Sequence, residues 1–171
     1  MAVSCDLDEG FDVYAESFPK ARKSHKCTEC DKEIEIGEVY ASCRGLYDGA
    51  FQTYPQHVKC YHLCRAANGV YGYCTIPFCA LSLWAFDRDH WGDPAWLMYA
   101  AALAEIFGDS WRRAFLDTYE DGSEHEGDHH PDWIVARKSL DAPVDWAQIE
   151  ADSLAYCPSG VIVKVTLGRA A

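Results

Sequence analysis

The pattern of apolar and polar residues changes character near residue 70. Before that point the apolar segments are short and alternate with polar positions, as residues 11–15 do, which predicts strands. Residues 39–45 and 50–54 flank the dipeptide Asp48-Gly49, a combination typical of tight turns. We therefore expect a β-hairpin in the N-terminal part of the chain.

After residue 70 the apolar runs are long enough for helices. Residues 95–107 contain a single charge, Glu105, and are apolar nearly all round, which predicts a buried helix. Asp93-Pro94 supplies a capping residue and a first-turn proline for its start, and Gly108 supplies its end. Further helices are expected at residues 61–67, 110–119 and 143–155.

The remaining pattern predicts which faces are buried and adds two strands. Trp111, Phe115 and Tyr119 recur at a spacing of four, so they share one helical face, and the set Trp146, Ile149 and Ser153 shares another. Residues 133–137 and the alternating valines of residues 161–167 are expected as strands.

Cysteine spacing provides the first chemistry. Cys27-x2-Cys30 is followed at a distance by Cys60-x3-Cys64, and two such pairs are the usual source of four soft ligands for one tetrahedral Zn²⁺. We expect zinc as the cofactor, bound by the four cysteines. His57 is the alternative ligand, because positions 57, 60 and 64 would share one face of a helix. His62 is a further candidate in the same segment.

The order of knuckle, hairpin and ligand-bearing helix is that of a treble clef. The predicted fold class is therefore α+β: a treble-clef-like zinc finger at residues 1–70, packed on a mainly helical acidic domain at residues 71–171 that ends in a strand. A short, glycine-turned segment with little apolar content needs such a metal staple.

The finger also carries a resemblance. Its residues are Ala21 to Lys26 before the first cysteine pair, Ile36-Gly37-Glu38 and Tyr40, Arg44-Gly45, Asp48-Gly49, Tyr54 and the closing pair. Over about residues 20–66 these resemble small bacteriophage and prophage zinc-finger proteins, mostly of unassigned function. This chain departs from them by having three residues, not two, within the closing pair. The resemblance implies a phage-type accessory protein and no reaction.

Charge narrows the class of partner. The formal net charge is −12, and a chain of that charge is repelled by nucleic acid as a whole. Residues 117–132 contain seven acidic residues and no Lys or Arg, so we expect a solvated acidic loop and a candidate binding surface, formed by Asp117, Glu120, Asp121, Glu124, Glu126, Asp128 and Asp132. The alternative is that the acidity serves only solubility.

The number of cysteines and the length of the apolar runs indicate the cellular compartment of the protein. The chain has nine cysteines, begins without a basic-then-apolar leader and has no run of about 18 apolar residues. We expect a cytoplasmic protein, in the host cell if phage-encoded, with reduced cysteines and no membrane span.

Other constellations are weaker. Cys74-x4-Cys79 suggests a second metal site, although buried free thiols are commoner. His129 and His130 suggest a metal-dependent nuclease, but they lie on a segment separate from the finger. Lys20, Arg22, Lys23 and Lys26 form a basic cluster that neighbouring carboxylates nearly cancel, namely those of Glu29, Asp31, Glu33, Glu35 and Glu38.

These observations predict a non-enzymatic protein. We expect a zinc-stabilised, acidic interaction protein that binds another protein and inhibits a nucleic-acid-binding or defence component of a host. A nucleic-acid-binding regulator is the alternative, and a nuclease is third, because the chain has no nucleophile motif or phosphate-binding loop.

Overall fold

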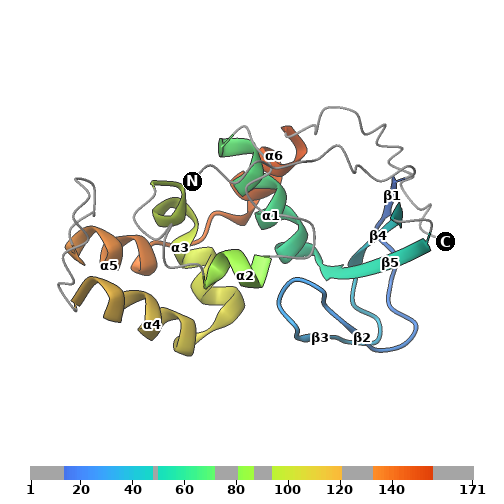
Figure 1. Cartoon of the computed structure of the whole chain (residues 1–171), viewed down its shortest axis with the longest axis horizontal. Coiled ribbons are helices and arrows are strands. Elements are labelled where there is room, and N and C mark those ends of the chain that lie inside the picture. Colours follow the sequence, from blue (N-terminus) through green and yellow to red (C-terminus); the bar gives the residue numbers. More distant parts are fainter. Residues whose placement is uncertain (1–13, 48–49, 72–80, 87–93, 121–132, 156–171) are drawn as a thin grey trace.

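The computed structural model describes residues 14–47, 50–71, 81–86, 94–120 and 133–155. It is a mixed α+β fold in which small sheets lie at one end and helices at the other (Figure 1). The strands are β1 (Tyr14–Ser17), β2 (His25–Lys26), β3 (Glu33–Ile34), β4 (Tyr40–Tyr47) and β5 (Ala50–His57). The helices are α1 (Val58–Tyr71), α2 (Leu81–Ala85), α3 (Pro94–Phe107), α4 (Asp109–Glu120), α5 (Trp133–Asp141) and α6 (Trp146–Ala155).

The strands form two antiparallel sheets. The larger has the order β1-β4-β5, and the smaller pairs β2 with β3. The β4–β5 ladder runs from Tyr40↔His57 to Tyr47↔Ala50, which confirms the predicted hairpin and leaves two residues for its turn. Pro55 lies within β5, an edge strand of this sheet, where a residue without an N–H group is tolerated.

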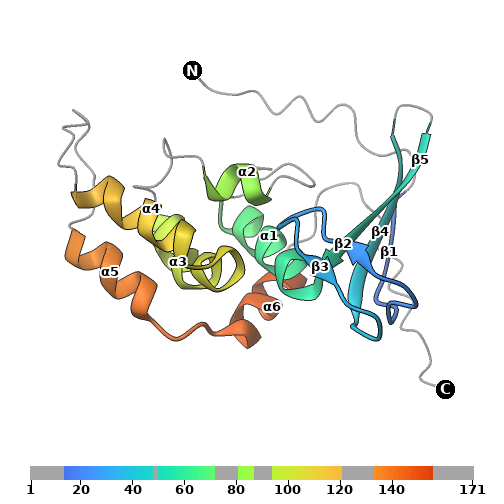
Figure 2. The same ribbon diagram turned by 90° about the horizontal axis from the view of Figure 1, so that it is seen from below.

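Helix α1 connects the sheets to the helical end. It follows β5 directly and lies beside α6 and α3 (Figure 2). One buried hydrophobic cluster runs through both ends of the molecule: it contains Ile34 and Leu63 from the N-terminal part together with Leu103 and Trp111 from the helices. The N-terminal part and the helices therefore share a core.

Helices α3 and α4 confirm two predictions. Helix α3 begins at Pro94, and at its end Gly108 adopts a φ of +83° and donates its N–H to the Ala104 carbonyl at 2.8 Å, a glycine-dependent termination. In α4, Trp111 and Phe115 are fully buried and stacked with ring centroids 5.1 Å apart. The Trp111 indole N–H donates to the Ala85 carbonyl at 2.6 Å.

The prediction for residues 133–137 is wrong. They form the start of helix α5 instead of a strand. The β-branched pair Ile134 and Val135 favoured a strand locally, but Ala136 and Leu140, at a helical spacing of four, are both buried in the main core. Helix α6 confirms the predicted face, with Ile149 and Ser153 buried and Trp146 half-buried. The C-terminal strand predicted at residues 161–167 lies outside the described residues.

A buried polar cluster ties β1, α1 and α6 together. Glu16 accepts hydrogen bonds from Arg65 at 3.0 Å and from the Tyr61 hydroxyl at 2.7 Å. Burial raises the pKa of Tyr61, so its hydroxyl stays a donor. On the same side of α1, His62 lies 3.0 Å from the Ser153 hydroxyl, and burial lowers the pKa of that imidazole. His62 therefore has a packing role away from the cysteines.

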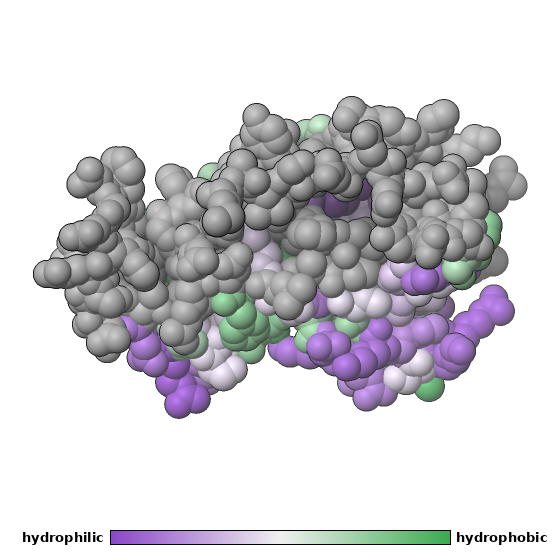
Figure 3. All heavy atoms as spheres, viewed as in Figure 1, coloured by the Kyte–Doolittle hydropathy of each residue, from purple (hydrophilic) through white to green (hydrophobic). Residues whose placement is uncertain are grey.

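The polarity of the described surface varies along the molecule. In Figure 3 the visible atoms at the β2–β3 end are mainly hydrophilic, and apolar surface gathers between that end and the helices. None of the described helices has the length and apolar character needed to cross a bilayer.

The shared core generates the first prediction. Replacing Leu103, which is fully buried in α3, with Asp removes apolar packing and buries an unpaired carboxylate. The loss should be about 4 kcal/mol or more, comparable with the whole stability of a small domain. The variant should show no cooperative thermal transition by circular dichroism. Met98→Asp, on the 59% exposed position of the same helix, should melt close to the parent. A cooperative, soluble Leu103→Asp protein would place the core elsewhere.

Candidate metal centre

Four side chains converge at the junction of the two sheets with α1. Cys27 and Cys30 come from the turn between β2 and β3, His57 is the last residue of β5, and Cys60 lies in the first turn of α1. Their ligand atoms all lie within 4.8 Å of one another. Ligands around a tetrahedral Zn²⁺ are separated by about 3.3–3.8 Å, given bond lengths of about 2.0–2.3 Å. Small side-chain adjustments therefore suffice for these four residues to bind one ion.

The β2–β3 turn presents its two sulfurs through backbone hydrogen bonds. The Cys27 N–H donates to the Lys32 carbonyl at 2.8 Å, and the Asp31 N–H donates to the Cys27 carbonyl at 3.0 Å. Asp31 has a φ of +61°, a left-handed conformation that Asp tolerates better than most side chains. This residue turns the chain away immediately after the second sulfur.

A second set of contacts fixes this turn against β5. Thr28 donates twice to the Pro55 carbonyl, from its N–H at 2.9 Å and from its hydroxyl at 3.2 Å. The His57 N–H points to the Cys27 sulfur at 3.3 Å. The cysteine turn and the last residues of β5 are thus held in register, which brings His57 and Cys60 to the cysteine pair.

The imidazole of His57 is oriented for metal binding. Its Nδ1 lies 3.4 Å from the Cys30 sulfur, and its Nε2 lies 3.2 Å from the Glu33 carbonyl oxygen. A carbonyl only accepts, so Nε2 carries the proton and donates it there. Nδ1 then keeps its lone pair on the side of the sulfurs. Such a hydrogen bond on the far nitrogen is the usual support for a metal-binding histidine.

The three thiols perturb one another strongly. Hydrogen bonds from the Cys30 and Cys60 thiols lower the pKa of Cys27. The same contact with Cys27 raises the pKa of Cys30 to about 11 and raises that of Cys60. The three sulfurs are close enough to share one divalent cation, whose binding would displace the thiol protons.

Cys64 does not belong to this group. It lies four residues beyond Cys60 on α1, half-buried and packed against the hydrophobic core. Four residues of helix carry it about 6 Å further along the helix axis than Cys60. The alternative ligand, His57, takes that place in the group. The available signal was the spacing: His57-x2-Cys60 has the two-residue separation that Cys60-x3-Cys64 lacks.

The buried carboxylate of Glu29 stabilises the cysteine turn through hydrogen bonds to other elements. Glu29, between the two cysteines, is 1% exposed. One of its carboxylate oxygens accepts from the Gln56 amide at 2.7 Å, and the other accepts from the Leu81 N–H at 2.8 Å. This residue therefore connects the cysteine turn with β5 and with α2. The sequence predicted only that Glu29 helps to cancel the charge of the basic cluster, because no residue pattern around it indicates a buried position.

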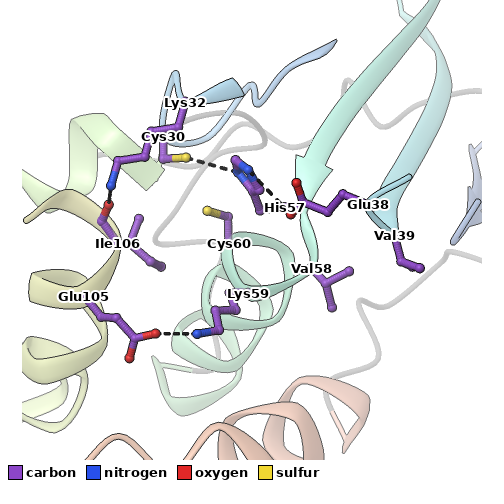
Figure 4. Close-up of a pocket in the computed structure, with 10 residues that line it drawn as sticks. All are labelled: Cys30, Lys32, Glu38, Val39, His57, Val58, Lys59, Cys60, Glu105 and Ile106. Carbon is purple, nitrogen blue, oxygen red and sulfur yellow. Dashed lines mark hydrogen bonds and ion pairs between the residues drawn. The ribbon is translucent and has the colours of Figure 1, made fainter. Parts of the chain in front are cut away.

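A cavity of about 320 Å³ lies beside the group, toward the end of α3 (Figure 4). Cys30, His57 and Cys60 line one side, and Glu105 and Ile106 line the other. Two lysines cross the rim: Lys32 donates to the Ile106 carbonyl, and Lys59 pairs with Glu105. The Lys59 contact lowers the pKa of Glu105, which also accepts from the Trp146 indole at 3.0 Å. The metal group is thereby joined to α3 and α6.

The structure places few of the other candidate residues. Asp117 is exposed on α4, and Glu120 ends that helix. The rest of the predicted acidic surface lies outside the described residues, as do His129, His130, Cys74 and Cys79. Cys43 is buried in β4 beside Gln56. The basic side chains of Lys20, Arg22, Lys23 and Lys26 are all exposed, and Lys26 pairs with Asp31 at 2.8 Å.

Comparison of the chain with protein-family models, with curated proteins and with solved structures finds no match. The assignment of the site therefore depends on its own geometry and on the chemistry of its donor atoms.

The choice between His57 and Cys64 gives a direct test. In the presence of a competing chelator, His57→Ala should lose zinc, whereas Cys64→Ala should retain about one ion per chain, because only the first change removes one of four converging ligands. Elemental analysis of the purified proteins measures this. Retention by the histidine variant with loss by the cysteine variant would return Cys64 to the site.

Glu29→Gln tests the support behind the turn. The amide replaces one accepting oxygen with a donor, which would face the N–H of Gln56 or of Leu81. We expect a loss of about 1–3 kcal/mol in the free energy of unfolding, the usual cost of a buried unsatisfied donor. Urea unfolding measures it, and Glu35→Gln at an exposed position is the matched control. Equal stabilities would show that the Glu29 contacts contribute little.

Proposed function

We propose that this protein binds one structural Zn²⁺ through Cys27, Cys30, His57 and Cys60. We further propose that the zinc-stabilised finger at residues 1–70 binds another protein. The observation that carries the metal assignment is the convergence of these four donors with His57 already oriented by the Glu33 carbonyl. Three sulfurs and one imidazole suit zinc better than magnesium or calcium, which prefer oxygen ligands.

The finger is proposed to be a treble clef. In support of this, the cysteine turn between β2 and β3 is followed by the β4–β5 hairpin and then by α1, which carries the last ligand. Four protein ligands complete a tetrahedral shell, and a shell without an open position is typical of structural zinc. The proposal is accordingly a binding protein and not an enzyme.

The nature of the partner is inferred from charge. A chain with a formal net charge of −12, before any metal thiolate is counted, favours a partner with a basic surface. Complementary charge gives fast and salt-sensitive association. Together with the resemblance of residues 20–66, this supports inhibition of a host nucleic-acid-binding or defence protein whose basic groove the acidic chain would occupy.

A second candidate has its own support. The four basic side chains that precede the cysteine turn are all exposed. They favour a regulator that contacts phosphates directly, despite the overall charge. The nuclease alternative has no such support among the described residues.

Affinity purification from a bacterial host lysate, with a DNA mobility-shift assay beside it, tests the proposed function. At about 150 mM salt, where interactions between exposed charges more than about 8 Å apart are largely screened, we expect a basic protein to be retained and DNA not to shift. The zinc-loaded chain is compared with His57→Ala, which should lose the partner as the scaffold loosens. A variant with Lys20, Arg22, Lys23 and Lys26 all changed to Ala should keep it. Tight DNA binding that this last variant abolishes, with no protein retained, would favour the regulator.

A further inference from the structure

A second cavity lies in the helical end, away from the metal group. It has a volume of about 310 Å³ and is bounded by α3, by the connection between α5 and α6, and by α6. Its apolar lining includes Leu97, Met98, Val144 and Ile149. Met98 is 59% exposed, so part of this apolar surface is open to solvent.

The charge around this cavity has one sign. Among the described residues that line it, the charged ones are Asp145 and Asp152. Asp145 accepts from the Gln148 N–H at 2.9 Å, and Asp152 accepts from the Gln148 side-chain amide at 2.8 Å. Asp145 directly precedes α6, and the spacings of three and four place Asp145, Gln148 and Asp152 on one side of this helix and its start. Among the residues that the structure describes, no Lys or Arg forms an ion pair with either carboxylate.

Tyr99 adds an unused polar group to the same wall. It lines the cavity and is 1% exposed, and its hydroxyl is buried with no hydrogen-bond partner among the described residues. Burial, with the charge of Asp152 as a smaller cause, raises the pKa of Tyr99 to about 12, so the phenol stays neutral. A buried hydroxyl without a partner carries an uncompensated desolvation cost, which a bound donor would offset.

The complement of this lining is a group with an apolar stem and a cationic, donor-only head. An alkylammonium has both, since it carries three N–H donors and no acceptor. Lysine presents this head on four methylene groups, which cover apolar surface while the charge reaches a polar rim. Carboxylate ligands would be repelled by the two aspartates.

We propose that this cavity receives a lysine side chain from the protein partner, with its stem against Leu97, Met98 and Val144 and its ammonium at Asp152 and the Tyr99 hydroxyl. The inference depends on the proposed function for the identity of the ligand as part of a basic protein. It adds a location formed by described residues, none of which belongs to the predicted acidic surface.

The test uses the full, zinc-loaded chain and three capped pentapeptides, Ala-Leu-X-Leu-Ala, in which X is Lys, norleucine or Glu. Binding is followed by two-dimensional ¹H–¹⁵N spectra during titration. The Lys peptide should shift amides of α3 and α6 and leave those of β2 and β3 unchanged. The norleucine peptide, with an uncharged stem of similar length, should bind about fivefold more weakly, and the Glu peptide more weakly still, because one favourable charge contact is worth about 1 kcal/mol.

Three variants locate the contact. Asp152→Asn should weaken the Lys peptide about fivefold and leave the norleucine peptide unchanged, and Tyr99→Phe should weaken it by a smaller factor. Tyr99→Phe removes an unpartnered hydroxyl, so the variant should fold at least as well as the parent. Glu150→Gln, at an exposed position of α6 that does not line the cavity, is the matched control and should change nothing.

Three results would overturn the inference. They are equal binding of all three peptides, no shifts in α3 and α6, or a Lys-peptide affinity in the Asp152→Asn and Tyr99→Phe variants equal to that of the parent. These failures are distinct from failure of the proposed function. If a basic partner is retained from lysate while the Lys peptide ignores this cavity, the partner binds elsewhere. If the peptide binds and no partner is retained, lysine binding by the cavity is supported and the proposed function is rejected.

Discussion

The contact between the Cys27–Cys30 turn and the start of α1 determines how the N-terminal half of this protein is built. Each of the pieces involved is too short to be stable alone: β2 and β3 have two residues each, and the turn between them depends on a left-handed Asp31. They are held by the Pro55 carbonyl, by the His57 N–H and by the three sulfurs. A bound metal would join the four ligands by strong bonds, and its binding energy would become folding energy.

Side-chain contacts connect the same junction with the rest of the described fold. Glu29 reaches α2, Lys32 reaches the end of α3, and Lys59 reaches Glu105, which also contacts Trp146 of α6. Lys59 additionally lies over the Trp146 ring, 4.6 Å from its centroid. On the other side of α1, Arg65 and Tyr61 share the buried carboxylate of Glu16. Helix α1 is therefore fixed on both sides by polar contacts in addition to the core.

Sequence reasoning recovered what depends on local periodicity and missed what depends on partners distant in the chain. Helix α3 is apolar nearly all round, and its proline and glycine mark its two ends, so its position followed from local rules. Residues 133–137 have the residue types of a strand, yet they become helical because burial at Ala136 and Leu140 selects that period. The identity of the fourth ligand, His57 or Cys64, depends on the residue at which α1 starts, which the sequence did not determine. Because the helix begins at Val58, Cys60 lies in its first turn and belongs to the group, whereas Cys64, one turn further on, does not.

The continuous core has a consequence for how metal affinity is set. Anything that binds only the folded state stabilises it, and the reverse also holds: a loss of stability anywhere in a cooperative unit lowers apparent affinity for the ligand. Ile34 and Leu63, which flank the metal group, belong to the same buried cluster as Trp111 and Phe115 of α4. Substitutions in α4 therefore act on the metal centre through folding, although they touch none of its ligands. The second cavity, between α3 and α6, contains none of the four metal ligands, so a ligand bound there would not compete for the metal.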